Sequence, residues 1–199
     1  MNLSTKSQGL VIVGLTLLVI AIAYGFAPNA SHPETLSEHI GYMLRVTALV
    51  GFGMLLLAYV ARPLVQLIGW GRPLLIQRRY IGLSAAASLT IHFGYVAAFL
   101  MTSGEPLDWM TGVFAGAAFA LMWVMALTST DVARRRLGVG WKRLHGIGIH
   151  YVWLIFMQTF FGVAVESGSR WAEVMAALGL VALCIRLAAW LGQRFKRTA

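Results

Sequence analysis

The sequence predicts an all-α integral membrane protein, a bundle of six transmembrane helices with both termini in the cytoplasm. Apolar residues make up 59% of the 199 residues, charged residues make up only 12%, and the mean hydropathy is +0.75. A soluble domain carries about a quarter of its residues charged. The apolar residues also gather into runs of spanning length, and the basic residues gather between them on one side. Together these observations exclude an ordinary soluble domain.

Six apolar runs approach the roughly 20 residues that a helix needs to cross a hydrocarbon core about 30 Å thick. We expect one transmembrane domain over residues 1–199, with spans at about 8–27, 42–61, 80–101, 111–128, 144–165 and 172–191. The first run is too long for the apolar core of a typical signal peptide, and Ala27-Pro28-Asn29-Ala30 is a poor cleavage site. We therefore interpret the first run as a retained helix.

The basic residues set the orientation, because Lys and Arg are enriched in the cytoplasmic connections of membrane proteins. Those on the predicted cytoplasmic side are Lys6, Arg62, Arg72, Arg78, Arg79, Arg134, Arg135, Arg136, Lys142, Arg143, Arg194, Lys196 and Arg197. Arg45 and Arg170 fall on the other side. The acidic residues of that side are Glu34, Glu38, Glu105, Asp108, Glu166 and Glu173. The net charge of +9 thus indicates topology and contact with membrane lipid, and a nucleic-acid partner is not expected.

Two connections and the single cysteine add detail. Residues 63–73, bounded by two prolines, are too short and too broken to span, so we expect them at the inner interface. Residues 128–131 (Thr-Ser-Thr-Asp) predict the start of a short basic helix, because their oxygens can cap free N–H groups, and Gly138 predicts its end. Cys184 lies in an apolar run, where we expect it to be a hidden core residue.

Polar side chains inside the hydrocarbon are costly and are functional candidates by default. The candidates here are His92, His145, His150, Gln158 and Arg45. His32 and His39 fall in the predicted outer loop before the second span, where a histidine is usually only solvated.

His92 is the most informative candidate. It lies thirteen residues past Arg79, about 20 Å along a helix, so its side chain cannot reach the inner interface. Ala85, Ser88 and His92 share one helical face, which leaves room for a flat ring beside the helix. A small-residue face also serves plain helix packing, and a neutral imidazole can simply hydrogen-bond a neighbouring helix. Both interpretations stay open.

The fifth span opens with two histidines, in the stretch His145-Gly-Ile-Gly-Ile-His150. Neutral imidazoles on opposed helices are usual axial ligands of a b-type heme. The two histidines point about 140° apart, so one heme can hardly use both as axial ligands. Depth favours His92 with His150, and His145 could bind a second, inner cofactor or cap a heme edge. Arg45 could pair with heme propionates or snorkel outward as an interfacial arginine.

Gln158 and several missing motifs limit the cofactors that we expect this chain to bind. Gln158 lies thirteen residues after His145, at about the depth of His92, and glutamine is a poor heme ligand; this weighs against a stacked pair of hemes. The sequence has no phosphate-binding loop and no dinucleotide-binding glycine motif after a strand. The metal patterns HExxH and CxxC are also missing.

Several stretches resemble the ferric reductase-like transmembrane domain family. They are Arg78-Arg79-Tyr80-Ile81-Gly82-Leu83 running on to His92, Leu127-Thr128-Ser129-Thr130-Asp131, Arg136-Leu137-Gly138 and Trp141-Lys142-Arg143-Leu144-His145. The resemblance covers about residues 40–190, and its specific part is 78–153. It implies a six-helix core that binds b-type heme and passes electrons across a bacterial inner membrane.

The resemblance also implies ligands. His92 and His145 match family histidines that bind heme or are needed for it, and Arg45 matches an arginine near the start of the second span. The family histidine thirteen residues after the one matched by His145 is Gln158 here, which makes His150 a substitute ligand. The earlier family histidine of the third span falls near Arg78, so one heme b is expected rather than two.

The function expected from this resemblance is that of an electron-transfer subunit of an oxidoreductase. Electrons would come from a quinol, a flavin or a partner reductase, because the chain has no room for a nicotinamide domain, and FMN could bind as in some relatives. The acceptor would be a periplasmic redox partner or a small oxidant. The alternative is a non-heme transporter or membrane scaffold in which the histidines form a structural network.

Overall fold

The structure is a computed structural model that describes residues 3–104 and 108–198, without the side chains of residues 3, 33, 34 and 196–198. Seven helices occupy these ranges, and no strand occurs in them. They are α1 (Leu3–Gly25), α2 (Pro33–Ile68), α3 (Arg72–Ser103), α4 (Trp109–Leu127), α5 (Asp131–Leu137), α6 (Val139–Ser167) and α7 (Arg170–Thr198).

Every helix except α5 is long and apolar enough to cross a membrane, which makes six candidate spans among the described residues. The all-α fold class and the six spans are thus confirmed at the level of helix length and composition. The orientation with both termini in the cytoplasm stays a prediction. Of the charges used for it, Glu105 and the side chains of Glu34, Lys196 and Arg197 lie outside the described residues.

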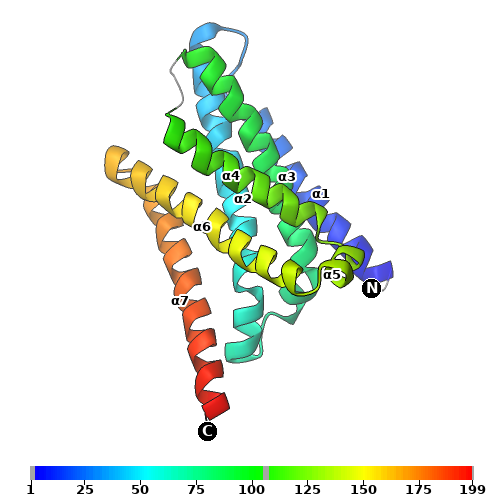
Figure 1. Ribbon diagram of the computed structural model, residues 1–199. Helices are drawn as coiled ribbons and strands as arrows, with labels where there is room; N and C mark the ends of the chain where they lie inside the picture. Colours follow the sequence, from blue (N-terminus) through cyan, green and yellow to red (C-terminus); the bar gives the residue numbers. More distant parts are fainter. Residues whose placement is uncertain (1–2, 105–107, 199) are drawn as a thin grey trace.

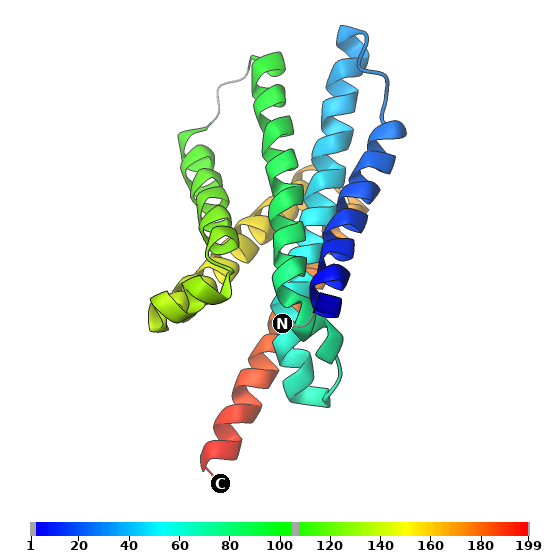
Figure 2. The same ribbon diagram turned by 90° about the vertical axis from the view of Figure 1, so that its right-hand side faces the viewer.

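The helices form one layered bundle. α2 and α3 are the most extensively packed pair, α1 packs mainly against α3, and α7 packs against α2 and α6. α4 packs on α6, and Figure 1 shows α6 crossing α2 at a steep angle. Both termini lie at the same end of the bundle as the turn between α2 and α3 and the short α5 (Figures 1 and 2). We call this the basic end, because the basic connections predicted from the sequence lie there.

An aromatic cluster holds α2 to α6 at the centre of the bundle. The ring of Phe52 lies 4.8 Å from that of Phe156 and 5.0 Å from that of Phe160, measured between centroids. Phe52 and Phe160 are buried. A Cβ atom on Gly179 of α7 would meet Phe52 and Met157, so α7 approaches closely because this residue has no side chain. Large apolar residues elsewhere face outward, as expected for helices that contact lipid.

The second and third helices are longer than predicted. The sequence places residues 63–73 in a broken interfacial segment, whereas α2 continues through Pro63 to Ile68 and α3 begins at Arg72. The turn between them is made by Gly69 and Gly71, whose φ angles of 70° and 94° favour glycine. At 36 residues, α2 is about 54 Å long, so it exceeds the thickness of a hydrocarbon core.

Pro63 stays inside α2 because other groups satisfy the backbone it disturbs. Proline has no N–H, so the carbonyl of Tyr59, four residues earlier, loses its helical donor. Arg186 of α7 donates from Nη1 to this carbonyl over 3.1 Å, and Arg78 of α3 donates from Nε to the adjacent Ala58 carbonyl over 2.9 Å. Two arginines therefore bond the backbone of α2 where the proline interrupts its ladder.

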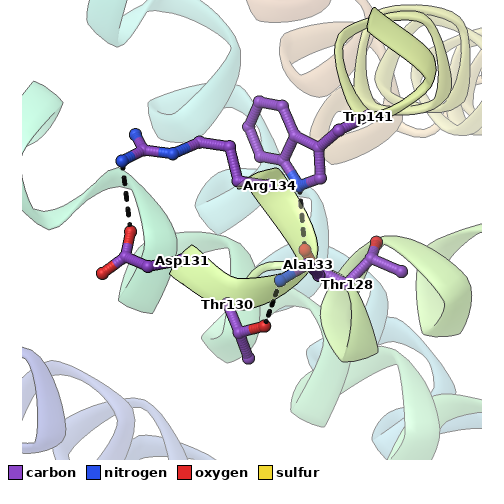
Figure 3. A network of polar contacts seen from close by, with 6 residues as sticks. All are labelled: Thr128, Thr130, Asp131, Ala133, Arg134 and Trp141. Carbon is purple, nitrogen blue, oxygen red and sulfur yellow. Dashed lines mark hydrogen bonds and ion pairs between the residues drawn. The ribbon is translucent and has the colours of Figure 1, made fainter. Parts of the chain in front are cut away.

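The predicted short helix between the fourth and fifth spans is confirmed as α5, and Figure 3 shows its contacts. Thr130 caps it, accepting a hydrogen bond from the Ala133 amide over 3.1 Å. Asp131 pairs with Arg134 at 3.3 Å, and the helix ends at Gly138 with a φ of 51°. The indole of Trp141 donates over 2.8 Å to the Thr128 carbonyl, so α6 is tied directly to the end of α4.

Two residue placements differ from the sequence expectation. His39 is not a solvated loop residue, because α2 begins at Pro33 and buries it to 6% exposure. Its Nδ1 lies 2.8 Å from the Pro28 carbonyl, and its ring meets Tyr24 and Tyr95. Cys184, expected in the core, is exposed, because it lies on the outward face of α7.

Candidate functional site

His92 is held by α2 through one ring nitrogen. Its Nδ1 lies 3.1 Å from the Leu44 carbonyl and 3.1 Å from Thr47 Oγ1. A carbonyl can only accept, so we assign the ring proton to Nδ1. In the neutral imidazole, Nε2 then carries the lone pair, and it has no hydrogen-bond partner among the described residues. This is the tautomer in which a histidine binds a metal through Nε2.

The partners of His92 are themselves fixed. The hydroxyl of Thr47, which is fully buried, donates to the Met43 carbonyl over 2.6 Å and so presents a lone pair to His92. Ser88, one turn before His92 and also fully buried, donates to the Thr47 carbonyl over 2.9 Å. The face of Ala85, Ser88 and His92 predicted from the sequence is thus the face that α3 presents to α2.

His150 has the same internal arrangement on α6. Its Nδ1 lies 2.6 Å from the Gly146 carbonyl of the preceding turn, so Nε2 again carries the lone pair in the neutral ring. The ring meets Tyr59 of α2 edge-on, with centroids 5.3 Å apart. His150 is exposed, so its Nε2 is open to a ligand from outside the chain.

His145 is engaged at both ring nitrogens. Its Nδ1 lies 3.2 Å from the Trp141 carbonyl, and its Nε2 lies 3.1 Å from the Met125 carbonyl of α4. The indole of Trp141 stacks on the imidazole at 4.0 Å. His145 therefore joins α6 to α4. An iron bound at Nε2 would have to displace the Met125 carbonyl.

The structure does not bring His92 and His150 together. His92 meets α2 at Thr47, whereas His150 meets it at Tyr59, twelve residues and about 18 Å further along the helix. α3 and α6 do not pack against each other over the described residues. His145 and His150 contact different helices, α4 and α2, in keeping with the 140° between them.

Within the described residues, no hydrogen bond or ring contact joins Arg45 or Gln158 to His92, His145 or His150. The guanidinium of Arg45 lies 5.3 Å from the ring centroid of Trp171, on the α7 side of α2. Gln158 is exposed.

A heme with two histidine ligands needs two lone-pair nitrogens about 4 Å apart, since a metal–imidazole bond is about 2 Å long. His92 and His150 each fit as a single axial ligand, because each keeps Nε2 free. As a pair they do not fit one iron in this arrangement, because α3, which carries His92, does not pack against α6, which carries His150, over the described residues. Within the described ranges, no group of three or more histidine, cysteine or acidic side chains is placed to hold a metal ion.

Sequence reasoning missed Arg186, which lies inside the sixth apolar run and bonds the carbonyl freed by Pro63. A charged side chain within an apolar run of spanning length is a sufficient signal of a functional candidate. Sequence reasoning also missed Tyr59, whose buried hydroxyl has no hydrogen-bond partner among the residues that the structure describes. A tyrosine within an apolar run gives no comparable signal, because its ring packs well in any core.

No family model matches the chain, and no solved structure matches it.

Proposed function

We propose that this chain is a b-type heme membrane cytochrome that transfers electrons across a bacterial inner membrane. The observation that carries the proposal is His92: α2 holds its Nδ1 proton, and Nε2 keeps its lone pair inside a candidate span. An imidazole oriented in this way by a backbone carbonyl is the usual form of a histidine that binds a metal. The resemblance to the ferric reductase-like family, argued from residues 78–153, supports the same function.

In this proposal His92 would hold the heme iron through Nε2. His150 is favoured over His145 as the second axial ligand, because within the described part of the chain its Nε2 has no hydrogen-bond partner, whereas that of His145 meets the Met125 carbonyl. To share one iron with His92, His150 would have to move along α2 from Tyr59 toward Thr47, away from the basic end of the bundle. The heme supplies one-electron redox chemistry when bound. The chain's own residues hold the imidazole protons and surround the site with apolar helices.

The donor in this proposal is a quinol, a flavin such as FMN or a partner reductase, and the acceptor is a periplasmic redox protein or a small oxidant. Within the family, the chain resembles in particular the heme-binding membrane subunit of the periplasmic methionine sulfoxide reductase system, MsrQ. In this proposal Arg45 would pair with a heme propionate from the α7 side, since its guanidinium lies over the ring of Trp171.

Absorption spectra of protein purified after heme-replete expression test the proposal. The wild type is expected to show the Soret and alpha bands of a b-type heme, and His92→Ala is expected to lose them. Separate His145→Ala and His150→Ala variants identify the second ligand by the same loss. His32→Ala is the control, because His32 is exposed before α2. A wild-type protein without these bands would contradict the proposal.

One observation favours a second function, a transporter or scaffold in which the histidines form a structural network. The bonds of His92 and Ser88 to α2 join two helices whether or not a cofactor binds. This function predicts a His92→Ala protein that is less stable but has the same absorption spectrum as the wild type.

A further inference from the structure

Three arginines from three helices gather around the second half of α2, at the basic end of the bundle. Arg78 of α3 and Arg186 of α7 donate to the neighbouring carbonyls of Ala58 and Tyr59, so both guanidinium groups are directed at one turn of α2. Their charges act on each other, and the charge of Arg62, one turn further along α2, acts on both. Like charges placed this closely repel, so the cluster needs a counter-charge.

The protein does not supply that counter-charge within the described residues. None of these three arginines forms an ion pair there, and Asp131 pairs instead with Arg134 on α5. The other acidic side chains of the described chain lie at the opposite end: Glu38, Asp108, Glu166 and Glu173. Three cations in helices apolar enough to span a membrane, with no carboxylate beside them, cost free energy unless an anion binds them.

The cluster has free donors and is open to the surface. Each guanidinium has five N–H donors, of which Arg78 and Arg186 each give one to a carbonyl. Arg78 and Arg186 are half-buried, whereas Arg62 is exposed. Arg186 also lies 4.4 Å over the ring of Tyr59, whose buried hydroxyl lacks a partner. Donors that converge without acceptors are the pattern of an anion site.

We propose that Arg62, Arg78 and Arg186 form a binding site for a phosphate group between α2, α3 and α7. Arginine matches the geometry of phosphate through paired N–H bonds, and basic pockets between membrane helices near the interface bind lipid head groups. The phosphate can belong to an anionic phospholipid or to free inorganic phosphate. The site is built from residues other than the histidines and is independent of any heme.

Binding of phosphatidylglycerol and of inorganic phosphate to the detergent-purified chain tests this. Native mass spectrometry measures retained lipid, and tryptophan fluorescence follows thermal unfolding after delipidation and titration with either compound. Arg62→Gln is the first variant, because Arg62 is exposed and bonds no backbone group of the described chain, so its loss spares the fold. Arg186→Gln is the second, and because Arg186 also bonds the Tyr59 carbonyl, its result is compared with that of Arg62→Gln. Arg143→Gln is the control, since it removes one exposed charge from the same end but outside the cluster.

Retention of phosphatidylglycerol, and a rise in unfolding temperature with it, are expected for the wild type and Arg143→Gln. Both variants of the cluster should bind about tenfold more weakly, as the loss of one charge-assisted bond implies. Stabilisation by inorganic phosphate alone, lost in the same variants, supports a site for soluble phosphate. The proposal is overturned if neither compound binds the wild type, or if Arg62→Gln and Arg143→Gln bind equally well.

Discussion

At the residue scale, the chemistry of His92 depends on which atoms α2 offers it. The Leu44 carbonyl and Thr47 Oγ1 both lie 3.1 Å from Nδ1, and the Thr47 hydroxyl proton is already donated to Met43. The ring proton therefore stays on Nδ1 without any charged partner. A carboxylate in the same place would also attract the proton but would hold the imidazole as a cation more readily.

The Thr47→Val substitution tests this arrangement. It removes one acceptor from His92 but leaves the Leu44 carbonyl and nearly the same volume. Because hydrogen bonds between membrane helices contribute about 0.6 kcal/mol on average, we expect a loss of about that size in the free energy of unfolding. Thr90→Val is the control, since Thr90 is exposed and bonds only to Ala86 of its own helix. Equal losses in both variants, measured by denaturant unfolding in micelles, would contradict the assignment.

Asp108 makes a pH-dependent contribution at the start of α4. The Thr111 amide and hydroxyl donate to its carboxylate over 2.9 and 3.1 Å, and they lower the pKa of Asp108 below its ordinary value. A lowered pKa means that the cap stabilises α4 above the ordinary pKa, about 4, and is lost as the pH falls through the folded-state pKa. A carboxyl chemical-shift titration should show the lowered midpoint. Thr111→Val keeps the amide donor and removes the hydroxyl, so it should raise the midpoint in part, and an unchanged midpoint would contradict the contribution of the hydroxyl.

At the element scale, local signals in the sequence predict α5 well and the bounds of α2 and α3 poorly. Thr130 and Gly138 sit where cap chemistry requires them, and cap chemistry depends on a few neighbouring residues only. The sequence predicts that the second span ends at residue 61, because residues 63–73 are too short and too broken to span. The helix continues because arginines from α3 and α7 bond its carbonyls, and no local pattern contains those partners.

The cap of α5 can be removed by Thr130→Ala. A helix of seven residues is too short to be stable alone, so it depends on its cap and on the contacts of its ends. We expect a loss of about 1 kcal/mol in local stability and faster hydrogen exchange at the Ala133 amide, which loses its acceptor. Thr130→Ser keeps the oxygen and should behave as the wild type. Unchanged exchange at Ala133 in Thr130→Ala would contradict the role of the cap.

The contact of α1 with α3 depends on Gly9. A Cβ atom at this position would overlap the ring of Tyr80, which is buried. Gly9→Val is therefore expected to lower the free energy of unfolding by about 1–3 kcal/mol, as overpacking does. Gly14→Val is a matched control on the same helix, because a Cβ atom on Gly14 meets nothing within 4 Å. A smaller loss for Gly9→Val than for Gly14→Val would contradict this packing.

At the scale of the whole molecule, the number of candidate spans and the presence of histidines within those on α3 and α6 could be predicted from composition and spacing. How those histidines sit relative to each other could not. Depth along separate helices favours His92 with His150 over His92 with His145, but α6 crosses α2 at a steep angle, so depth along each helix does not predict proximity. The burial of His39 and the exposure of Cys184 likewise depend on how far helices extend and which face they turn inward.

The basic end of the bundle is predicted to face the cytoplasm, and the natural cysteine gives a means to test this. Cys184→Ala removes the one thiol, which lies on the outward face of α7. In that background, Ser4→Cys places a thiol at the basic end and Ser31→Cys places one in the connection between α1 and α2. A membrane-impermeant maleimide added to intact spheroplasts should label the Ser31→Cys protein and not the Ser4→Cys protein, whereas lysed membranes should be labelled in both. The reverse pattern would place Arg62, Arg78 and Arg186 at the outer surface and would contradict the predicted orientation. The phosphate site could still bind lipid there, but its ligand would then come from the outer leaflet of that membrane.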